Sequence, residues 1–426
     1  MTGTDVGILG AGPAGMAAAI RAHEAGARII VMDDNPGAGG QIWRGGERTQ
    51  TSSQARQWLR RFQGIEQFTL ANCRVVSAEA NPLKLLVETG AGAEEIVARS
   101  LILATGAREI FLPFPGWTLP GVMGVGGLQA MAKSGLPIEG KTIVVAGSGP
   151  LLLAVAAYLK GHGAEVKLIA EQAPRSALTR FGVKLLRTPG KLAQAASLQL
   201  SLLGIPYLQS CWIERAEGDG HLEAVVMRRD GKTWTVACDY AAVAYGLYPN
   251  AEMAALLGCR MSGAVVAVDE LQRTSIENIY CAGECTGIGG VDLSIVEGEI
   301  AGYAATGNLH RARKLSGRRK RAQAFADALN TAFALRAELK QLPRADTFVC
   351  RCEDVTFARL QSVRSFRVAK LHTRCGMGPC QGRVCGPAAD FLFGWRTESV
   401  RPPVFPARLG TLITKQSEEE EITASQ

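Results

Sequence analysis

Five of the eleven cysteines of this chain lie close together near its end. Cys350 and Cys352 form a C-x-C pair, and Cys375 and Cys380 form a C-x4-C pair 22 residues further on. Clustered thiolates of this kind bind metal, and the two competing ligands are a tetrahedral zinc ion and a [2Fe–2S] cluster. Structural zinc usually has two to four residues between paired cysteines, so the C-x-C pair is atypical of zinc.

The glycines around the second cysteine pair favour the iron–sulfur interpretation. Gly376 and Gly378 would let the backbone wrap a cluster whose sulfides accept N–H hydrogen bonds. Cys385 is expected to lie in a helix and is an alternative to Cys375 or Cys380 as a ligand. Zinc binding and unligated cysteines remain the alternatives to a cluster. The predicted [2Fe–2S] ligands are Cys350, Cys352, Cys375 and Cys380.

A glycine-rich turn near the N-terminus has the pattern of a nucleotide site. GAGPAG at 10–15 lies between an apolar strand expected at 6–9 and a helix of small residues. Such glycines permit a tight turn, a close backbone approach to a pyrophosphate and close packing of helix on strand. The helix N-terminus then offers free N–H groups to phosphates. An acid at the end of the next strand can bind a ribose diol, and Asp34 is the alternative to Asp33. The predicted residues are Gly10, Gly12, Pro13, Ala14, Gly15, Asp33 and Asp34.

The turn alone does not distinguish FAD from NAD, but two distant segments favour FAD. LILATG at 101–106 and the strand end at 283–284 resemble segments of flavoprotein reductases with two dinucleotide domains. The alternative for Glu284 is a solvated side chain after a structural turn. The glycines at 39–40 would let the backbone lie against a flat or phosphorylated ligand, or form a plain turn. These segments add Gly40, Gln41, Ala104, Thr105, Gly106, Gly283 and Glu284 to the predicted site.

A second strand–turn–helix–strand unit follows at 141–171, with GSGP at 147–150. Leu152 stands where the third glycine is expected, and Glu171 ends the following strand. The unit either binds NAD(P)H or keeps the fold without a ligand, and the second interpretation is favoured. Cys281 and Cys285 flank the 283–284 turn, and they form either a redox disulfide or a packing pair.

These segments together predict an α/β protein in which one Rossmann-like domain is inserted within another. The expected FAD-binding domain covers 1–120 and 265–308, and the inserted, degenerate NAD-like domain covers 121–264. A basic helical linker is expected at 309–345, a small [2Fe–2S] domain at 346–395 and a tail at 396–426. The 22 residues between Cys352 and Cys375 leave little room for a second helix.

Composition narrows the possible classes of protein. Glycine makes up 49 of 426 residues, which suits close packing of helices on a parallel sheet. The net charge of +8 is modest, and the basic run at 311–321 lacks the interleaved aromatics of a nucleic-acid surface. It is expected to be a solvated linker or to face an acidic partner.

We expect no transmembrane segment and no signal peptide, and hence a cytoplasmic location. Five scattered histidines indicate no catalytic constellation, so catalytic residues remain unknown.

The chain resembles the FAD-binding alpha subunits of heteromeric dye-linked amine and amino-acid dehydrogenases. That family includes D-hydroxyproline dehydrogenase, octopine and nopaline dehydrogenases and hydrogen cyanide synthase. The resemblance rests on GAGPAG, on PGAGGQIWR at 36–44, on AGECTGIGG at 282–290 and above all on CRCEDVT at 350–356 with TRCGMGPCQGRVCGP at 373–387. The last motif is similar to a bacterioferritin-associated-ferredoxin-like domain.

The resemblance implies a division of labour in a hetero-oligomer. A partner similar to glycine or sarcosine oxidases would oxidise the amine, and this chain would carry electrons through FAD and the cluster to an acceptor. It also implies that ATP can replace FAD at the first site, that FMN can lie at a subunit interface and that a small third subunit can be present. A stand-alone NAD(P)H-dependent reductase and a redox sensor or scaffold are the alternatives.

Overall fold

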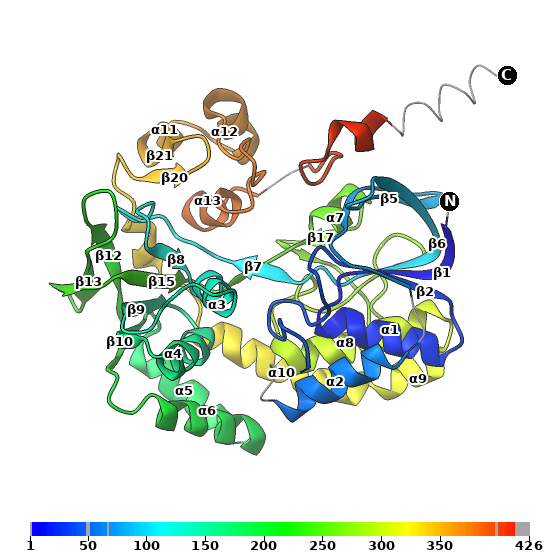
Figure 1. Ribbon diagram of the computed structural model, residues 1–426, viewed down its shortest axis with the longest axis horizontal. Coiled ribbons are helices and arrows are strands. Elements are labelled where there is room, and N and C mark those ends of the chain that lie inside the picture. The colour runs from blue at the N-terminus through cyan, green and yellow to red at the C-terminus, as the bar shows by residue number, and fades with distance from the viewer. Residues whose placement is uncertain (1, 48–51, 66–67, 187, 397–398, 414–426) are drawn as a thin grey trace. The chain divides into compact units, whose positions relative to one another are not determined.

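The computed structural model describes residues 2–47, 52–65, 68–186, 188–396 and 399–413 (Figure 1). The chain forms two compact units, Met1–Arg108 with Pro249–Asp327 and Ser399–Gln426, and Glu109–Tyr248 with Ala328–Glu398. This division falls earlier than the predicted boundaries at 120 and 265. Leu112, Phe114 and Trp117 explain the first difference, because they pack in the core of the second unit. The predicted α/β architecture with two Rossmann-like units is confirmed.

The first unit is built on a mostly parallel sheet. Five of its described strands run parallel to one another: β1 (Thr2–Leu9), β2 (Ile29–Met32), β3 (Phe68–Leu70), β6 (Ala93–Leu103) and β19 (Ile279–Cys281). The antiparallel strands β4 (Arg74–Ala80) and β5 (Leu83–Glu88) complete the order β3-β2-β1-β6-β5-β4, with β19 beside β6. β1 and β2 are apolar on both faces, as expected of a sheet that is covered on both sides.

Small residues let helices pack closely on one face of this sheet. α1 (Pro13–Glu24), α2 (Ser53–Gln63) and α8 (Gly290–Ala305) lie on that face (Figure 1). A Cβ on Gly298 would lie 2.1 Å from the Ala14 oxygen, and one on Gly302 would lie 2.4 Å from the Ala18 oxygen. Glycine at both positions therefore lets α8 contact the backbone of α1. The remaining elements are α7 (Glu252–Leu256), α9 (Leu309–Lys314), β17 (Met261–Ser262) and β18 (Val265–Val266).

The basic run after α8 is mostly exposed, as expected of a solvated segment, but two of its arginines pair with buried carboxylates. α10 (Ser316–Ala332) begins within the run. Arg318 donates to Glu299 at 2.6 Å, and Arg319 donates to Glu297 at 3.1 Å. Both carboxylates are buried in α8, so these two arginines neutralise charges that burial would otherwise penalise.

The second unit contains a parallel sheet in the order β11-β10-β9-β15-β8. Its strands are β8 (Val122–Gly124), β9 (Thr142–Gly147), β10 (Glu165–Glu171), β11 (Tyr207–Gln209) and β15 (Tyr240–Ala244). Asp230 and Gly231 form the turn of a hairpin between β13 (Ala224–Arg229) and β14 (Lys232–Ala237), and β13 also pairs with β12 (Cys211–Glu217). Its helices are α3 (Val125–Lys133), α4 (Leu151–Gly161), α5 (Arg175–Leu185) and α6 (Pro189–Ser201). The chain crosses between the units within β7 (Ala107–Glu109) and β16 (Leu247–Pro249).

The cysteine-rich segment belongs to this second unit. It contains η2 (Ala337–Gln341), β20 (Phe348–Cys350), β21 (Val355–Thr356), α11 (Phe357–Gln361), α12 (Phe366–Thr373) and α13 (Cys385–Phe393). Two helices fit between Cys352 and Cys375, contrary to expectation, because α11 and α12 have only five and eight residues. Trp117 anchors the segment by donating from its indole nitrogen to the Phe348 oxygen at 2.6 Å.

Part of the predicted tail is ordered on the first unit. The Val404 nitrogen donates to the Val76 oxygen at 2.7 Å, and Thr411 donates to Glu88 at 2.7 Å. The remainder of the predicted tail, 414–426, lies outside the described residues.

Candidate cofactor sites

The first glycine turn is held by contacts that admit only glycine. Gly10 has φ +104°, and a Cβ there would lie 2.3 Å from the Ala104 oxygen. A Cβ on Gly15 would lie 1.8 Å from the Gly10 oxygen. α1 therefore starts directly against the turn, and its N-cap, Gly12, provides no side-chain cap. The free N–H groups of the first turn of α1 suit the phosphates of a dinucleotide.

Of the two candidate acids, Asp33 is buried at the end of β2, and Asp34 is exposed. One oxygen of Asp33 accepts from the Ala11 nitrogen at 2.5 Å. The other accepts from the backbone nitrogen of Asn35 at 2.8 Å and from its side chain at 2.7 Å. A carboxylate has about four acceptor positions, so Asp33 can fix the loop and still accept a ribose hydroxyl.

The glycines at 39–40 lie against this turn. The Gly39 nitrogen donates to the Ala11 oxygen at 2.8 Å, and a Cβ on Gly40 would lie 3.0 Å from the Gly12 Cα. Gln41 is exposed and accepts from Arg44 at 2.8 Å. The backbone of this loop therefore lies beside the first glycine turn.

The structure brings the two distant segments to the same turn. Ala104 contacts Gly10 as described, and a Cβ on Gly283 would lie 2.8 Å from the Ala14 Cβ. Glu284 is largely buried and accepts from the Gly290 nitrogen at the start of α8, and burial raises its pKa. Glu284 is therefore not a solvated side chain.

Two further residues that contact the predicted residues of the first site were not predicted from the sequence. Asn250 donates to the Thr105 oxygen at 3.0 Å and accepts the Thr105 hydroxyl through its own carbonyl at 2.5 Å. Glu297 accepts from the Gly283 nitrogen at 3.1 Å. Asn250 could have been found from the sequence, because Pro249 and Asn250 mark the end of a strand. Nothing in the local pattern distinguished Glu297 from an ordinary residue of α8.

Cys281 and Cys285 have their sulfurs 3.1 Å apart, and both are buried. They lie in the same apolar core as Leu103 and Ile279. Cys285 also donates to the Ala282 oxygen at 3.2 Å. The two thiols therefore have packing and hydrogen-bonding roles in the wall of the first site.

Part of the second glycine turn is covered by a later segment of the chain. Ser148 donates to the Phe333 oxygen at 3.0 Å. Gln172 donates to the Ala334 oxygen at 3.2 Å and accepts from the Arg336 nitrogen at 3.2 Å. Ser148 and Gln172 are 5% and 0% exposed, although they lie at the carboxyl ends of β9 and β10, where a dinucleotide would bind. The segment 333–336 therefore covers Ser148 and Gln172 at these strand ends.

Glu171 lies at the end of β10 as Asp33 lies at the end of β2, and it makes the equivalent backbone contacts. Its oxygens accept from the Gly149 and Ala173 nitrogens, both at 2.8 Å, and the side chain is 0% exposed. Leu152 is fully buried in α4, which begins directly after the turn. The acid at this strand end thus holds the second turn through backbone contacts, as Asp33 holds the first.

Burial raises the pKa of Glu171 to about 7, above the value of 4.5 expected when the chain is unfolded. The unfolded state therefore ionises first as the pH rises, and stability falls between about pH 4.5 and 7. We expect Glu171→Gln to remove about 3 kcal/mol of this pH dependence, measured by denaturant unfolding at pH 5 and pH 8. Glu165→Gln, on the exposed part of β10, is the control. Equal pH dependence in all three proteins would contradict the expectation.

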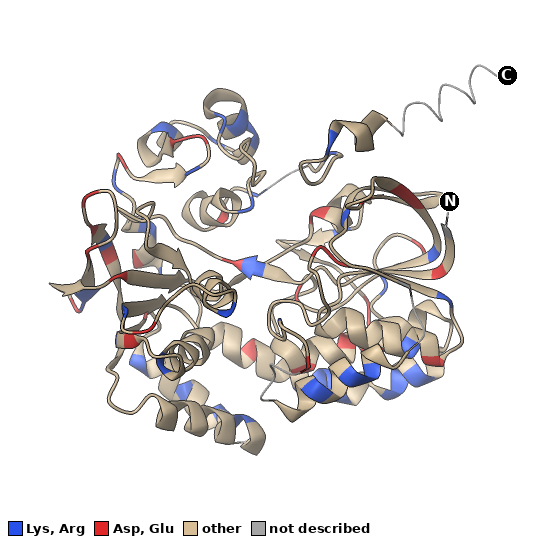
Figure 2. Cartoon of the chain, in the orientation of Figure 1, with Lys and Arg blue, Asp and Glu red and all other residues tan. Residues whose placement is uncertain are grey.

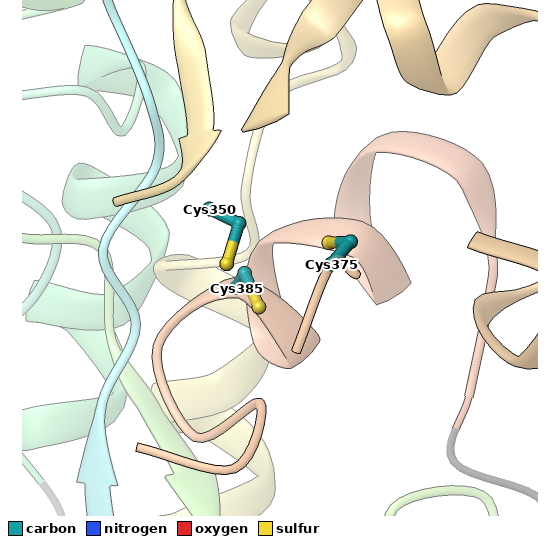
Figure 3. Close-up of side chains that lie close together, drawn as sticks. All are labelled: Cys350, Cys375 and Cys385. Carbon is teal, nitrogen blue, oxygen red and sulfur yellow. The ribbon is translucent and has the colours of Figure 1, made fainter. Parts of the chain in front are cut away.

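The five clustered thiols form two groups in the cysteine-rich segment. The sulfurs of Cys350, Cys375 and Cys385 lie within 4.8 Å of one another, and Figure 3 shows these side chains converging from three segments. Cys352 and Cys380 form a second pair with sulfurs 3.8 Å apart. Cys385 begins α13, as expected of a helix residue, yet its sulfur lies with the others.

The surroundings of these thiols suit a thiolate-bound metal. Hydrogen bonds from the Cys375 and Cys385 thiols lower the pKa of Cys350 to about 2. The Gly376 nitrogen donates to the Cys350 sulfur at 3.5 Å. A Cβ on Gly378 would lie 2.3 Å from the Cys352 Cβ, so the backbone wraps the thiols as the glycines predicted. An all-thiolate donor set of this kind fits iron or zinc.

The fold and the first site define a class of protein. Residues 4–315 match the family described as pyridine nucleotide-disulphide oxidoreductase. The chain belongs to this family, is an oxidoreductase, and has a first site for which the family supports FAD. In the part of the chain that the structure describes, no helix is long and apolar enough to span a membrane.

Relatives place the chain more narrowly. It is 32% identical to hydrogen cyanide synthase subunit HcnB of Pseudomonas aeruginosa, over 90% of this chain and 92% of the relative. It is 30% identical to an opine oxidase subunit from Agrobacterium tumefaciens, over 96% and 91%. The resemblance to subunits of FAD-dependent dehydrogenases is thereby confirmed. L-proline dehydrogenase from P. horikoshii shares the fold with a TM-score of 0.68 at 20% identity, over 96% of this chain and 79% of that one.

Proposed function

We propose that the chain is the electron-transfer subunit of a heteromeric FAD-dependent amine or amino-acid dehydrogenase. FAD at the first site would exchange one or two electrons, and a [2Fe–2S] cluster on the thiols would exchange one at a time. The chain's own residues bind and orient these groups. The substrate would be a cyclic D-amino acid, an opine or glycine, and a flavoprotein partner similar to glycine or sarcosine oxidases would recognise it.

The observation that carries this proposal is the contrast between the two nucleotide sites. Asp34, which follows the acid at the first strand end, is exposed, whereas Gln172, at the equivalent position of the second site, is completely buried under the segment 333–336. A reductase must bind NAD(P)H to receive electrons, and the segment 333–336 lies where that ligand would bind. Electrons must then reach this chain from another donor, which the subunit names of its relatives support.

We expect NADH and NADPH to leave the flavin of the purified chain oxidised. Under anaerobic conditions, excess NADH should bleach the flavin band by less than a tenth in one hour, whereas dithionite should bleach it fully. Stopped-flow absorbance near 450 nm measures both. Rapid bleaching by NADH would instead support the stand-alone reductase.

Co-purification tests the hetero-oligomer. A tagged chain isolated from its own cells should return with a second flavoprotein, and amine oxidation should require both polypeptides. A chain that returns alone with full amine-oxidising activity would contradict the subunit model. Acid extraction of the chain would identify the first-site nucleotide as FAD or ATP, and extraction of the complex would reveal an interfacial FMN or a small third subunit.

We also propose a cytoplasmic location. All eleven cysteines are free thiols, and the cytosol keeps thiols reduced.

A further inference from the structure

Two consecutive helices of the second unit leave their apolar side chains exposed. Among the described residues, α5 buries Ala177 alone, and α6 buries none. We define the α5–α6 face by its most exposed apolar side chains, which are 38–69% exposed: Val183, Leu186, Leu192, Leu200 and Leu203. Helices of this length gain most of their stability from packing an apolar face. The α5–α6 face therefore lacks the covering surface that such helices normally have.

The stretch of sequence that carries these apolar side chains is also basic. Between Glu171 and Glu214 the sequence has no acidic residue, although the chain as a whole has 39 acidic and 47 basic residues. Figure 2 shows α5 and α6 with basic segments and no acidic ones. The basic residues of this stretch are Arg175, Arg180, Lys184, Arg187 and Lys191. The occupant of this face must tolerate both an apolar centre and a cationic edge.

A second copy of this chain is a poor occupant. A symmetric contact through the same face would place Arg180 and Lys184 of one copy near the equivalent cations of the other, and like charges at an interface are unfavourable. An acidic edge on the occupant would instead attract these side chains.

A membrane surface fits less well than a protein. Helices that lie in a membrane interface usually insert aromatic side chains. Residues 175–203 contain one aromatic, Phe181, and its ring packs edge-on against Phe333 with the centroids 5.7 Å apart. The exposed side chains are leucine and valine, which suit an apolar protein surface equally well.

We propose that the α5–α6 face docks the flavoprotein partner subunit, through a partner surface with an apolar centre edged by Asp and Glu. This inference rests on the proposed function and adds to it the place of contact. The apolar centre supplies area to bury, and the opposite charges select the partner and speed its association.

Paired surface variants of the full chain, co-expressed with the flavoprotein that co-purifies with it, test this inference. The apolar variant is Leu200→Ser with Leu203→Ser, and its control is Leu371→Ser with Leu409→Ser, where the side chains are 72% and 73% exposed. The charge variant is Arg180→Glu with Lys184→Glu, and its control is Arg313→Glu with Lys314→Glu, which are also exposed. The readouts are the Kd for the flavoprotein, circular dichroism and FAD content.

We expect each test variant to raise the Kd at least tenfold while the controls change it less than twofold, with circular dichroism and FAD content unchanged. A carbodiimide should also join Lys184 of the wild-type chain to a carboxylate of the flavoprotein. Unchanged affinity in both test variants would overturn the inference. So would binding of the wild-type chain to phosphatidylglycerol vesicles, or dimerisation, that the variants lose while they keep the flavoprotein.

The outcome for the wild-type chain separates the two proposals. If that chain returns without any flavoprotein, the proposed function itself fails. If it returns with the flavoprotein and the variants do too, only the docking surface fails.

Discussion

Gly15→Ala should leave the chain with less than a tenth of its FAD. The added Cβ would lie 1.8 Å from the Gly10 oxygen, a backbone atom that no rotamer change can move. α1 must therefore shift away from the turn, and its N–H groups then no longer meet the phosphates. Overpacking of this kind costs about 1–3 kcal/mol, which corresponds to roughly a 5- to 150-fold loss of affinity.

Gly37→Ala is the matched control, because a Cβ there has no neighbour within 4 Å. FAD content is measured by absorbance after acid release, and circular dichroism checks that the variant has folded. A Gly15→Ala protein with full FAD content would show that the nucleotide does not depend on this turn.

Substituting Cys350 should abolish the iron–sulfur chromophore. A [2Fe–2S] cluster would be held by four of these thiolates, and the structure offers two such sets. Cys352 and Cys380 form one pair, and Cys350 forms the other with either Cys375 or Cys385. A serine at Cys350, Cys352 or Cys380 should reduce bound iron at least tenfold, because it removes a thiolate ligand.

Cys375 and Cys385 are alternatives for the fourth ligand, so separate variants of these two residues test the prediction further. Cys375→Ser and Cys385→Ser should differ, since one removes a ligand and the other a neighbour of the cluster. Cys238→Ala, another buried cysteine of the second unit, is the control and should keep full iron. Iron analysis, visible absorbance and electron paramagnetic resonance of the reduced protein measure the outcome. Zinc in place of iron, or iron kept in every variant, would contradict the prediction.

The sequence by itself determined the local chemistry of both sites. The spacing of GAGPAG encodes a tight turn followed by a helix. Such a turn is formed by residues that are neighbours in the sequence, so its geometry depends little on the rest of the chain. The repeated pattern at 141–171 likewise identified the inserted Rossmann-like unit. The cysteine motifs together with the nucleotide turns indicated the family, which the relatives confirm.

Only the tertiary structure decided which distant segments meet. The covering of part of the second site depends on Phe333 and Ala334, which lie more than 150 positions from Gln172. The placement of Cys385 beside Cys350 depends on how α13 packs, and the neutralisation of Glu297 depends on how α10 packs against α8. The exposure of the apolar side chains of α5 and α6 likewise could not be predicted from the sequence of these helices. Such contacts arise from the packing of the whole chain. The spacing of residues in a motif determines only the local structure of that motif and not which distant segments pack against it.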